Sequence, residues 1–154
     1  MAIKSRLKFG TSSDDTLNGT DQSEIFLGFG GNDTIFARGG NDLAFGGRGN
    51  DLIFGGNGND HLFGGRGNDS IQGDAGQNVI IGGDGNDTLI GGDDKDEIFG
   101  NAGDDFINGG PDDDTVWGGA GTDTLRGGGG GGQFHDGEFK NFSKFVREII
   151  PKLG

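Results

Sequence analysis

The chain has 154 residues, of which 38 are glycine and only 29% are hydrophobic, so it cannot build an ordinary globular core from large side chains. Its formal net charge of −13 disfavours nucleic acid and anionic membranes as partners and favours multivalent cations. The absence of cysteine excludes a disulfide framework and a thiolate metal site, so the available ligands are oxygens that suit a hard cation.

The amino-terminal segment, residues 1–9, is basic. It has neither the apolar stretch nor the small-residue cleavage site of a secretory signal peptide, and no part of the chain reads as a transmembrane span. The repeats that follow are poorly formed at first, so we expect an irregular amino-terminal end.

A nine-residue period occupies residues 10–126, which divide without insertion into thirteen nonapeptides. Clear copies are GGRGNDLIF from Gly46, GGNGNDHLF from Gly55 and GGDGNDTLI from Gly82. The pattern is GGxGxDxUx, where U is a large apolar residue. A fixed short period of this kind is typical of a solenoid.

Each position of the repeat calls for a particular residue type. Glycines at positions 1, 2 and 4 permit positive φ and leave carbonyls free to point at an ion, as in Gly46, Gly49, Gly55, Gly58, Gly64, Gly67, Gly82 and Gly85. Position 8 carries one inward apolar side chain per repeat. Position 6 carries a carboxylate everywhere except at Asn78: Asp15, Glu24, Asp33, Asp42, Asp51, Asp60, Asp69, Asp87, Asp96, Asp105, Asp114 and Asp123.

Positions 7 to 9 predict a three-residue strand, so two repeats should close a coil of eighteen residues. We therefore expect an all-β, right-handed parallel β-roll, a β-solenoid of thirteen repeats. Turns n and n+2 would then stack about 4.8 Å apart, the spacing of neighbouring strands. Their position-6 carboxylates would lie close enough to need a cation between them.

The GGxGxDxUx repeats resemble the RTX (repeats-in-toxin) calcium-binding nonapeptide repeat of hemolysin-type β-rolls. The resemblance implies Ca²⁺ between stacked turns, held by about six oxygens from aspartates and turn carbonyls. The turn pairs suggest about 8 to 11 ions. Sites containing Asn78, paired with Asp60 and Asp96, should bind more weakly, and Asp94 and Asp112 depart from the position-4 glycine.

Without metal, stacked carboxylates repel and short strands bury little surface, so we expect a disordered chain. Calcium binding would then drive folding, and a Kd of about 10⁻⁴ to 10⁻³ M would restrict folding to the outside of the cell. The resemblance implies a secreted, extracellular protein exported by type I secretion without an amino-terminal signal peptide.

A glycine linker, residues 127–132, precedes a carboxy-terminal tail, residues 133–154. Its apolar residues recur at the spacing of a short amphipathic helix, which Asn141 would begin and Pro151 would end. The helix could cap the roll, act as a secretion signal or do both. The apolar stripe consists of Phe142, Phe145, Val146, Ile149 and Ile150.

Every second repeat has a large apolar side chain at position 9. Together these side chains form a larger apolar surface than a soluble monomer usually leaves exposed. We expect the tail helix to cover part of this face, and any remainder to mediate self-association or docking of a protein partner. The ladder consists of Leu27, Phe45, Phe63, Ile81, Phe99 and Trp117.

Catalytic motifs are missing from the sequence. There is no HExxH metalloprotease motif and no GxSxG nucleophile elbow, and the two histidines are His61 and His135. We therefore expect a non-enzymatic calcium-binding module. The alternatives are a non-catalytic folding and export module of a type I secreted exoenzyme or toxin, or an ice-binding or adhesin segment, whose regular threonine array Leu52 and Phe106 would interrupt.

Overall fold

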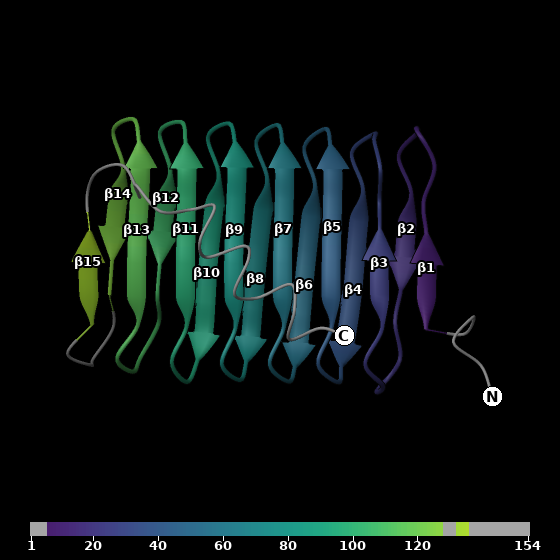
Figure 1. The fold of residues 1–154 in the computed structure, drawn as a ribbon, viewed down its shortest axis with the longest axis horizontal. Coiled ribbons are helices and arrows are strands. Elements are labelled where there is room, and N and C mark those ends of the chain that lie inside the picture. Colours follow the sequence, from purple (N-terminus) through teal and green to yellow (C-terminus); the bar gives the residue numbers. More distant parts are fainter. Residues whose placement is uncertain (1–5, 128–131, 136–154) are drawn as a thin grey trace, which may run out of the picture.

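The computed structural model describes residues 6–127 and 132–135, which form an all-β parallel solenoid (Figure 1). The first sheet has eight strands: β1 (Leu7–Phe9), β3 (Ile25–Leu27), β5 (Leu43–Arg48), β7 (His61–Arg66), β9 (Val79–Asp84), β11 (Glu97–Ala102), β13 (Thr115–Ala120) and β15 (Gln133–His135). The second has seven: β2 (Thr16–Asn18), β4 (Thr34–Gly39), β6 (Leu52–Asn57), β8 (Ser70–Ala75), β10 (Thr88–Asp93), β12 (Phe106–Asn108) and β14 (Thr124–Arg126).

Successive strands alternate between the two sheets, so each strand pairs with the strand two places further along the chain. Ile53 of β6 aligns with Ile71 of β8, and Leu62 of β7 aligns with Ile80 of β9, always in parallel register. The offset is eighteen residues, the coil length predicted from two nonapeptides. The predicted β-roll architecture is confirmed.

Most strands are longer than the predicted three residues. β7, for example, runs over six residues because its ladder continues through the glycines that begin the next repeat. Gly47 aligns with Gly65, and Arg48 with Arg66, beyond the apolar positions. Glycines at repeat positions 1 and 2 therefore belong to the strands as well as to the turns.

The core is a single column of position-8 side chains between the two sheets. Phe26, Ile53, Leu62 and Ile80 are completely buried. The column extends from Leu17 to Val116, with Leu125 packed against its end. One large side chain per nine residues is a thin core, so the backbone ladders and the turns must supply much of the order.

Strands are added at both ends, beyond the predicted boundaries 10–126. β1 pairs with β3, so part of the predicted amino-terminal segment belongs to the roll, and the irregular end that we expected is not found over residues 6–27. β15 pairs with β13, which places Gln133–His135 in the sheet. The predicted helix of the tail lies outside the described residues. Within the described part of the chain, no helix meets the length and apolarity that crossing a membrane requires.

The two turns with an aspartate in place of the position-4 glycine have the same backbone geometry as their neighbours. Asp94 and Asp112 replace the position-4 glycine, and they adopt φ values of 70° and 89°, in the left-handed region that glycine favours. An aspartate tolerates this region better than most residues do. The repeat geometry therefore overrides the local preference at both places.

Candidate metal centre

The turns lie along the two long edges of the solenoid, where Figure 1 shows the loops that join the sheets. Because the pairing offset is eighteen residues, position-6 side chains of successive repeats fall on opposite edges. The first edge carries Asp15, Asp33, Asp51, Asp69, Asp87, Asp105 and Asp123, and the second carries Glu24, Asp42, Asp60, Asn78, Asp96 and Asp114.

From the second coil onward, one oxygen of each position-6 side chain accepts a hydrogen bond from a backbone N–H of the previous coil. The backbone N–H of Asp51 donates to Asp69 Oδ1 at 2.8 Å, and that of Asp69 donates to Asp87 Oδ1 at 2.8 Å. The same contact recurs on the second edge, where Glu24 donates to Asp42 Oδ1 at 2.7 Å. Half of each carboxylate therefore serves the ladder between coils.

The other oxygen has no hydrogen-bond donor. Burying a polar atom without a partner costs about 1–3 kcal/mol, and more when the group is charged. A row of such atoms therefore indicates a missing positive partner. Ten oxygens share this state: Oδ2 of Asp33, Asp42, Asp51, Asp60, Asp69, Asp87, Asp96, Asp105, Asp114 and Asp123.

The predicted glycines surround these oxygens. A Cβ atom placed on Gly55 would lie 2.5 Å from Asp60 Oδ2 and 2.7 Å from the carbonyl oxygen of Gly73 in the next coil. Both oxygens thus face one small space that only glycine leaves open. Position-1 Gly46, Gly64 and Gly82 adjoin Asp51, Asp69 and Asp87 in the same way, and position-4 Gly49, Gly58, Gly67 and Gly85 have positive φ of 117° to 130°.

Asn78 shows what the arrangement needs. Its Oδ1 accepts the N–H of Asp60 at 2.9 Å, as an aspartate would. Its Nδ2 donates to the Gly76 carbonyl at 3.0 Å, so an amide hydrogen lies between two groups that would otherwise both present oxygen. At the aspartate rungs, that positive partner must come from a bound cation or a proton.

The pKa values of the buried aspartates also indicate that these carboxylates need a cation or a proton beside them. Burial raises the pKa of Asp42, Asp69, Asp87 and Asp96 from 3.8 to about 7, and that of Asp60 to about 6, against the opposing effect of the backbone hydrogen bonds. Neighbouring carboxylates of the same edge raise several of these pKa values further. Asp105 follows with a pKa of about 6, and the pKa values of Asp33, Asp51 and Asp114 are also raised by burial.

Any ion in these turns would take most of its ligands from the backbone. Among the described residues, no group of three or more acidic or histidine side chains converges on one point. The available ligands are carboxylate and carbonyl oxygens, with no nitrogen or sulfur. Such a ligand set suits Ca²⁺ better than Zn²⁺, which prefers histidine nitrogen and cysteine sulfur. The donor set therefore fits the ion that the sequence predicts.

The amino-terminal end of the second edge carries its own cation. Lys8 of β1 places Nζ 3.4 Å from Glu24 Oε1, and the Glu24 side chain is almost completely buried. The other oxygen of Glu24 accepts the N–H of Thr20 at 2.6 Å. Glu24, predicted as a metal ligand, thus already has a positive partner within the chain.

Position 5 carries a second ladder that the sequence reasoning missed. The N–H of Asn50 donates to Asn32 Oδ1 at 2.7 Å, and the N–H of Asn68 donates to Asn50 Oδ1 at 2.8 Å. These side chains are exposed and connect successive coils along the outer rim of the turns. The frequent asparagine before the position-6 aspartate was the signal that could have revealed it.

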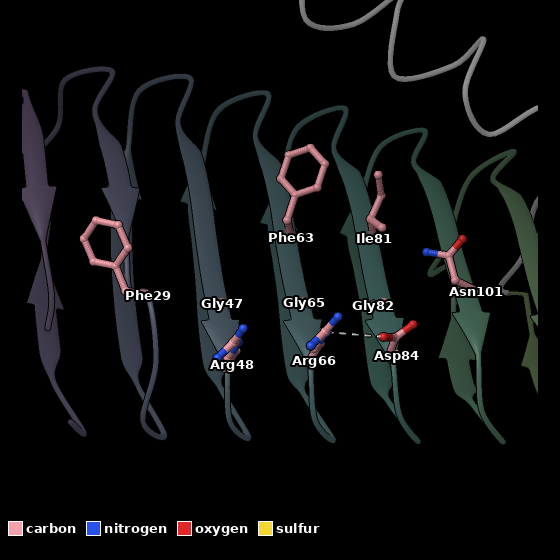
Figure 2. A pocket seen from close by; sticks show the side chains of 11 residues that line it. Phe29, Gly47, Arg48, Phe63, Gly65, Arg66, Ile81, Gly82, Asp84 and Asn101 are labelled. Atoms are coloured by element: carbon pink, nitrogen blue, oxygen red, sulfur yellow. Dashed lines mark ion pairs between the residues drawn. The ribbon is translucent and has the colours of Figure 1, made fainter. Parts of the chain in front are cut away.

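A shallow trough crosses the outer face of the eight-stranded sheet (Figure 2). Gly47 and Gly65 form part of its floor, Phe63 and Ile81 line one side, and Arg66 is paired with an aspartate on the other. The ion pair joins Arg66 Nε to Asp84 Oδ2 at 3.7 Å. The lining residues do not include a paired nucleophile and base, so the trough offers shape and charge and no recognisable catalytic constellation.

Comparison with known proteins agrees with this geometry. The sequence model of the RTX calcium-binding nonapeptide repeat matches residues 9–44, 38–71, 63–98, 72–107 and 99–134, which together span most of the chain. No curated protein matches it at a significant level. Repeats of this family form calcium-binding structural modules. The chain therefore belongs to the family of RTX calcium-binding nonapeptide repeat proteins.

Proposed function

We propose that this chain is a calcium-triggered folding module of a secreted protein, in which Ca²⁺ between stacked turns holds both edges of the roll together. The observation that carries the proposal is the set of ten buried aspartate oxygens without a hydrogen-bond donor. Each would bind calcium together with turn carbonyls. For Asp60, these are the carbonyls of Gly73 in the next coil and of Gly58, which corresponds to Gly76 in the Asn78 turn.

Folding depends on the ion because the metal-free roll has little else to stabilise it. The core contributes one buried side chain per repeat, while the edges stack carboxylates on one another. Binding free energy then becomes folding free energy, since an unfolded chain has no preformed site. The chain would stay unfolded at resting cytosolic calcium and fold at extracellular calcium, where modules of this kind bind with a Kd of about 10⁻⁴ to 10⁻³ M.

The proposal also accounts for secretion. RTX repeats are typical of secreted proteins. A chain that remains unfolded inside the cell can be exported without being unfolded first, and calcium outside the cell would then drive its folding. We propose type I secretion as the route. Expression beside a type I transporter should deliver the full chain to the medium, and retention in the cell would contradict this part of the proposal.

The test is a Ca²⁺ titration followed by far-UV circular dichroism, with Mg²⁺ at equal concentrations as the control. We expect a cooperative change from coil to β structure with Ca²⁺ and none with Mg²⁺, because Mg²⁺ requires a tighter octahedron and dehydrates reluctantly. Asp69→Asn should shift the midpoint to higher calcium, while Asp104→Asn, on the exposed rim, should not. Complete β structure in excess chelator at pH 7.5 would overturn the proposal.

A further inference from the structure

One sheet face carries a continuous outward ladder of large side chains. The eight-stranded sheet aligns the position-9 residues of alternate repeats, which stack as Phe45 on Phe63 at 4.7 Å and Phe99 on Trp117 at 4.4 Å between ring centroids. The ladder continues to His135, whose ring stacks on Trp117 at 5.4 Å. This ladder therefore forms an apolar stripe along the outer face of the sheet.

Burial along the ladder is unequal. Phe99 is 1% exposed and Ile81 is 5% exposed, although both belong to the outward ladder. Phe45 and Phe63 hold the same repeat position and also have apolar neighbours on both sides, yet they are only half-buried. Contacts within the ladder therefore do not account for the burial of Phe99. This burial calls for a contact beyond the ladder itself.

We propose that residues 136–154 of the same chain make this contact and dock on Ile81, Phe99 and Trp117. The chain leaves β15 at His135, which already stacks on Trp117, so the tail starts beside the surface that it would cover. The apolar stripe of the predicted helix would face the ladder. This inference does not depend on which cation occupies the edges.

The lengths agree. Ile81, Phe99 and Trp117 lie on consecutive strands of one sheet, so the patch is about 10 Å long at about 4.8 Å per strand. The predicted stripe, Phe142 to Ile150, would measure about 12 Å at 1.5 Å per residue. Residues 136–140 could span about 16 Å when extended, which suffices to bring the helix back over the patch.

The charge of the tail is compatible with docking on the roll. Residues 136–154 contain four basic and three acidic side chains, whereas the whole chain carries −13. Bound calcium would neutralise much of that acidic charge in the folded roll. The tail itself is nearly neutral, so it can bury its apolar stripe against the ladder in either charge state of the roll.

The exposed part of the ladder lies toward the amino-terminal end of the sheet. Phe63 lines the trough in Figure 2 together with Ile81, and Phe63 remains half-buried. A stripe of about 12 Å reaches Ile81 but stops short of Phe45, three strands from Phe99. The proposed occupant therefore explains the exposed part of the ladder as well as the buried part.

The only tryptophan of the chain, Trp117, reports on this contact. In the full chain with saturating calcium, Phe145→Asp should shift the emission of Trp117 to longer wavelength and raise acrylamide quenching by about twofold or more. Ser143→Asp adds the same charge beside the stripe and should change neither. Far-UV circular dichroism verifies that both variants remain folded. Wild-type fluorescence in Phe145→Asp would overturn the proposal.

A crosslink tests the same contact without disrupting it. Because the chain has no cysteine, Ile81→Cys with Ile149→Cys creates a single pair, which should oxidise to a disulfide within one chain. Ile81→Cys with Ser143→Cys is the matched control and should oxidise much more slowly. Equal rates for the two pairs, or a crosslink only between chains in a concentration-dependent dimer, would refute docking of the tail.

Discussion

Asn78→Asp restores the carboxylate that the second edge lacks. The bond from the Asp60 N–H to Oδ1, 2.9 Å in the wild type, can remain, but the bond from Nδ2 to the Gly76 carbonyl is lost. A carboxylate oxygen then faces that carbonyl without a proton between them. We expect a variant that is less stable than the wild type when calcium is scarce and more stable when it is abundant.

Whether Asn78→Asp stabilises or destabilises the fold depends on how much free energy calcium binding adds at a given calcium concentration. The lost hydrogen bond costs about 1 kcal/mol, and the added buried charge costs several kcal/mol unless a cation binds it. Position 78 belongs to two stacked turn pairs, with Asp60 and with Asp96. Each new site contributes about 1.4 to 2.7 kcal/mol at free calcium of roughly 10 to 100 times Kd, so two sites more than offset the lost bond.

Two measurements check this expectation. Equilibrium dialysis should find up to two more calcium ions per chain in Asn78→Asp, and thermal unfolding in saturating calcium should show a higher Tm. Asp69→Asn makes the opposite change on the first edge and should lose up to two ions and lower the Tm. If Asn78→Asp binds no additional calcium and melts no higher than the wild type, position-6 carboxylates are not the calcium ligands.

Three further changes test other parts of the structure. Without calcium, we expect more β structure at pH 4 than at pH 8: burial raises the pKa of Asp69 to about 7, so its contribution is complete below the ordinary value of 3.8 and is lost as pH rises through 7. Lys8→Met strips Glu24 of its cation and should lower the Tm in saturating calcium. Ile80→Ala should cost about 2–5 kcal/mol in urea unfolding with calcium, because it empties part of the core column.

Each of these changes has its own control. Equal β content at both pH values in metal-free buffer would contradict the raised pKa values. Lys95→Met breaks an exposed ion pair with Asp113 and should leave the Tm nearly unchanged, so an equal loss in both lysine variants would argue against a special role for Lys8. An unfolding free energy unchanged by Ile80→Ala would mean that the column is not the core.

The coil and its metal edges could be predicted because their chemistry repeats. Position 6 needs a carboxylate and position 8 needs an apolar side chain, and both demands recur every nine residues. A pattern with one inward residue in nine fixes the register of every strand. Asn78 could likewise be identified as a weak site from the sequence, although its hydrogen bond to Gly76 required coordinates.

Three features could not be predicted from the repeat pattern: the strands β1 and β15 and the ladder of asparagines. In β1 and β15, other residues replace those that define the repeat. In β1, Lys8 occupies the inward position, so the apolar pattern is absent although the strand pairs in register. Before β15, a run of glycines removes the position-6 carboxylate, and residues 133–135 therefore read as tail. The asparagine ladder escaped notice because Asn50 and its equivalents act through backbone hydrogen bonds that no apolar period records.

The structural unit of this solenoid is a coil of eighteen residues, although its sequence repeats every nine residues. Loss of the nonapeptide 100–108 would carry every following strand to the opposite sheet, so Trp117 would leave the ladder that holds Phe99, and the carboxylates that follow would change edges. Loss of two nonapeptides would shorten the roll by about 4.8 Å and preserve both faces. Viable length variants of this molecule should therefore differ by whole coils, and an odd number of repeats gained or lost should disrupt its outer surface while leaving its core column intact.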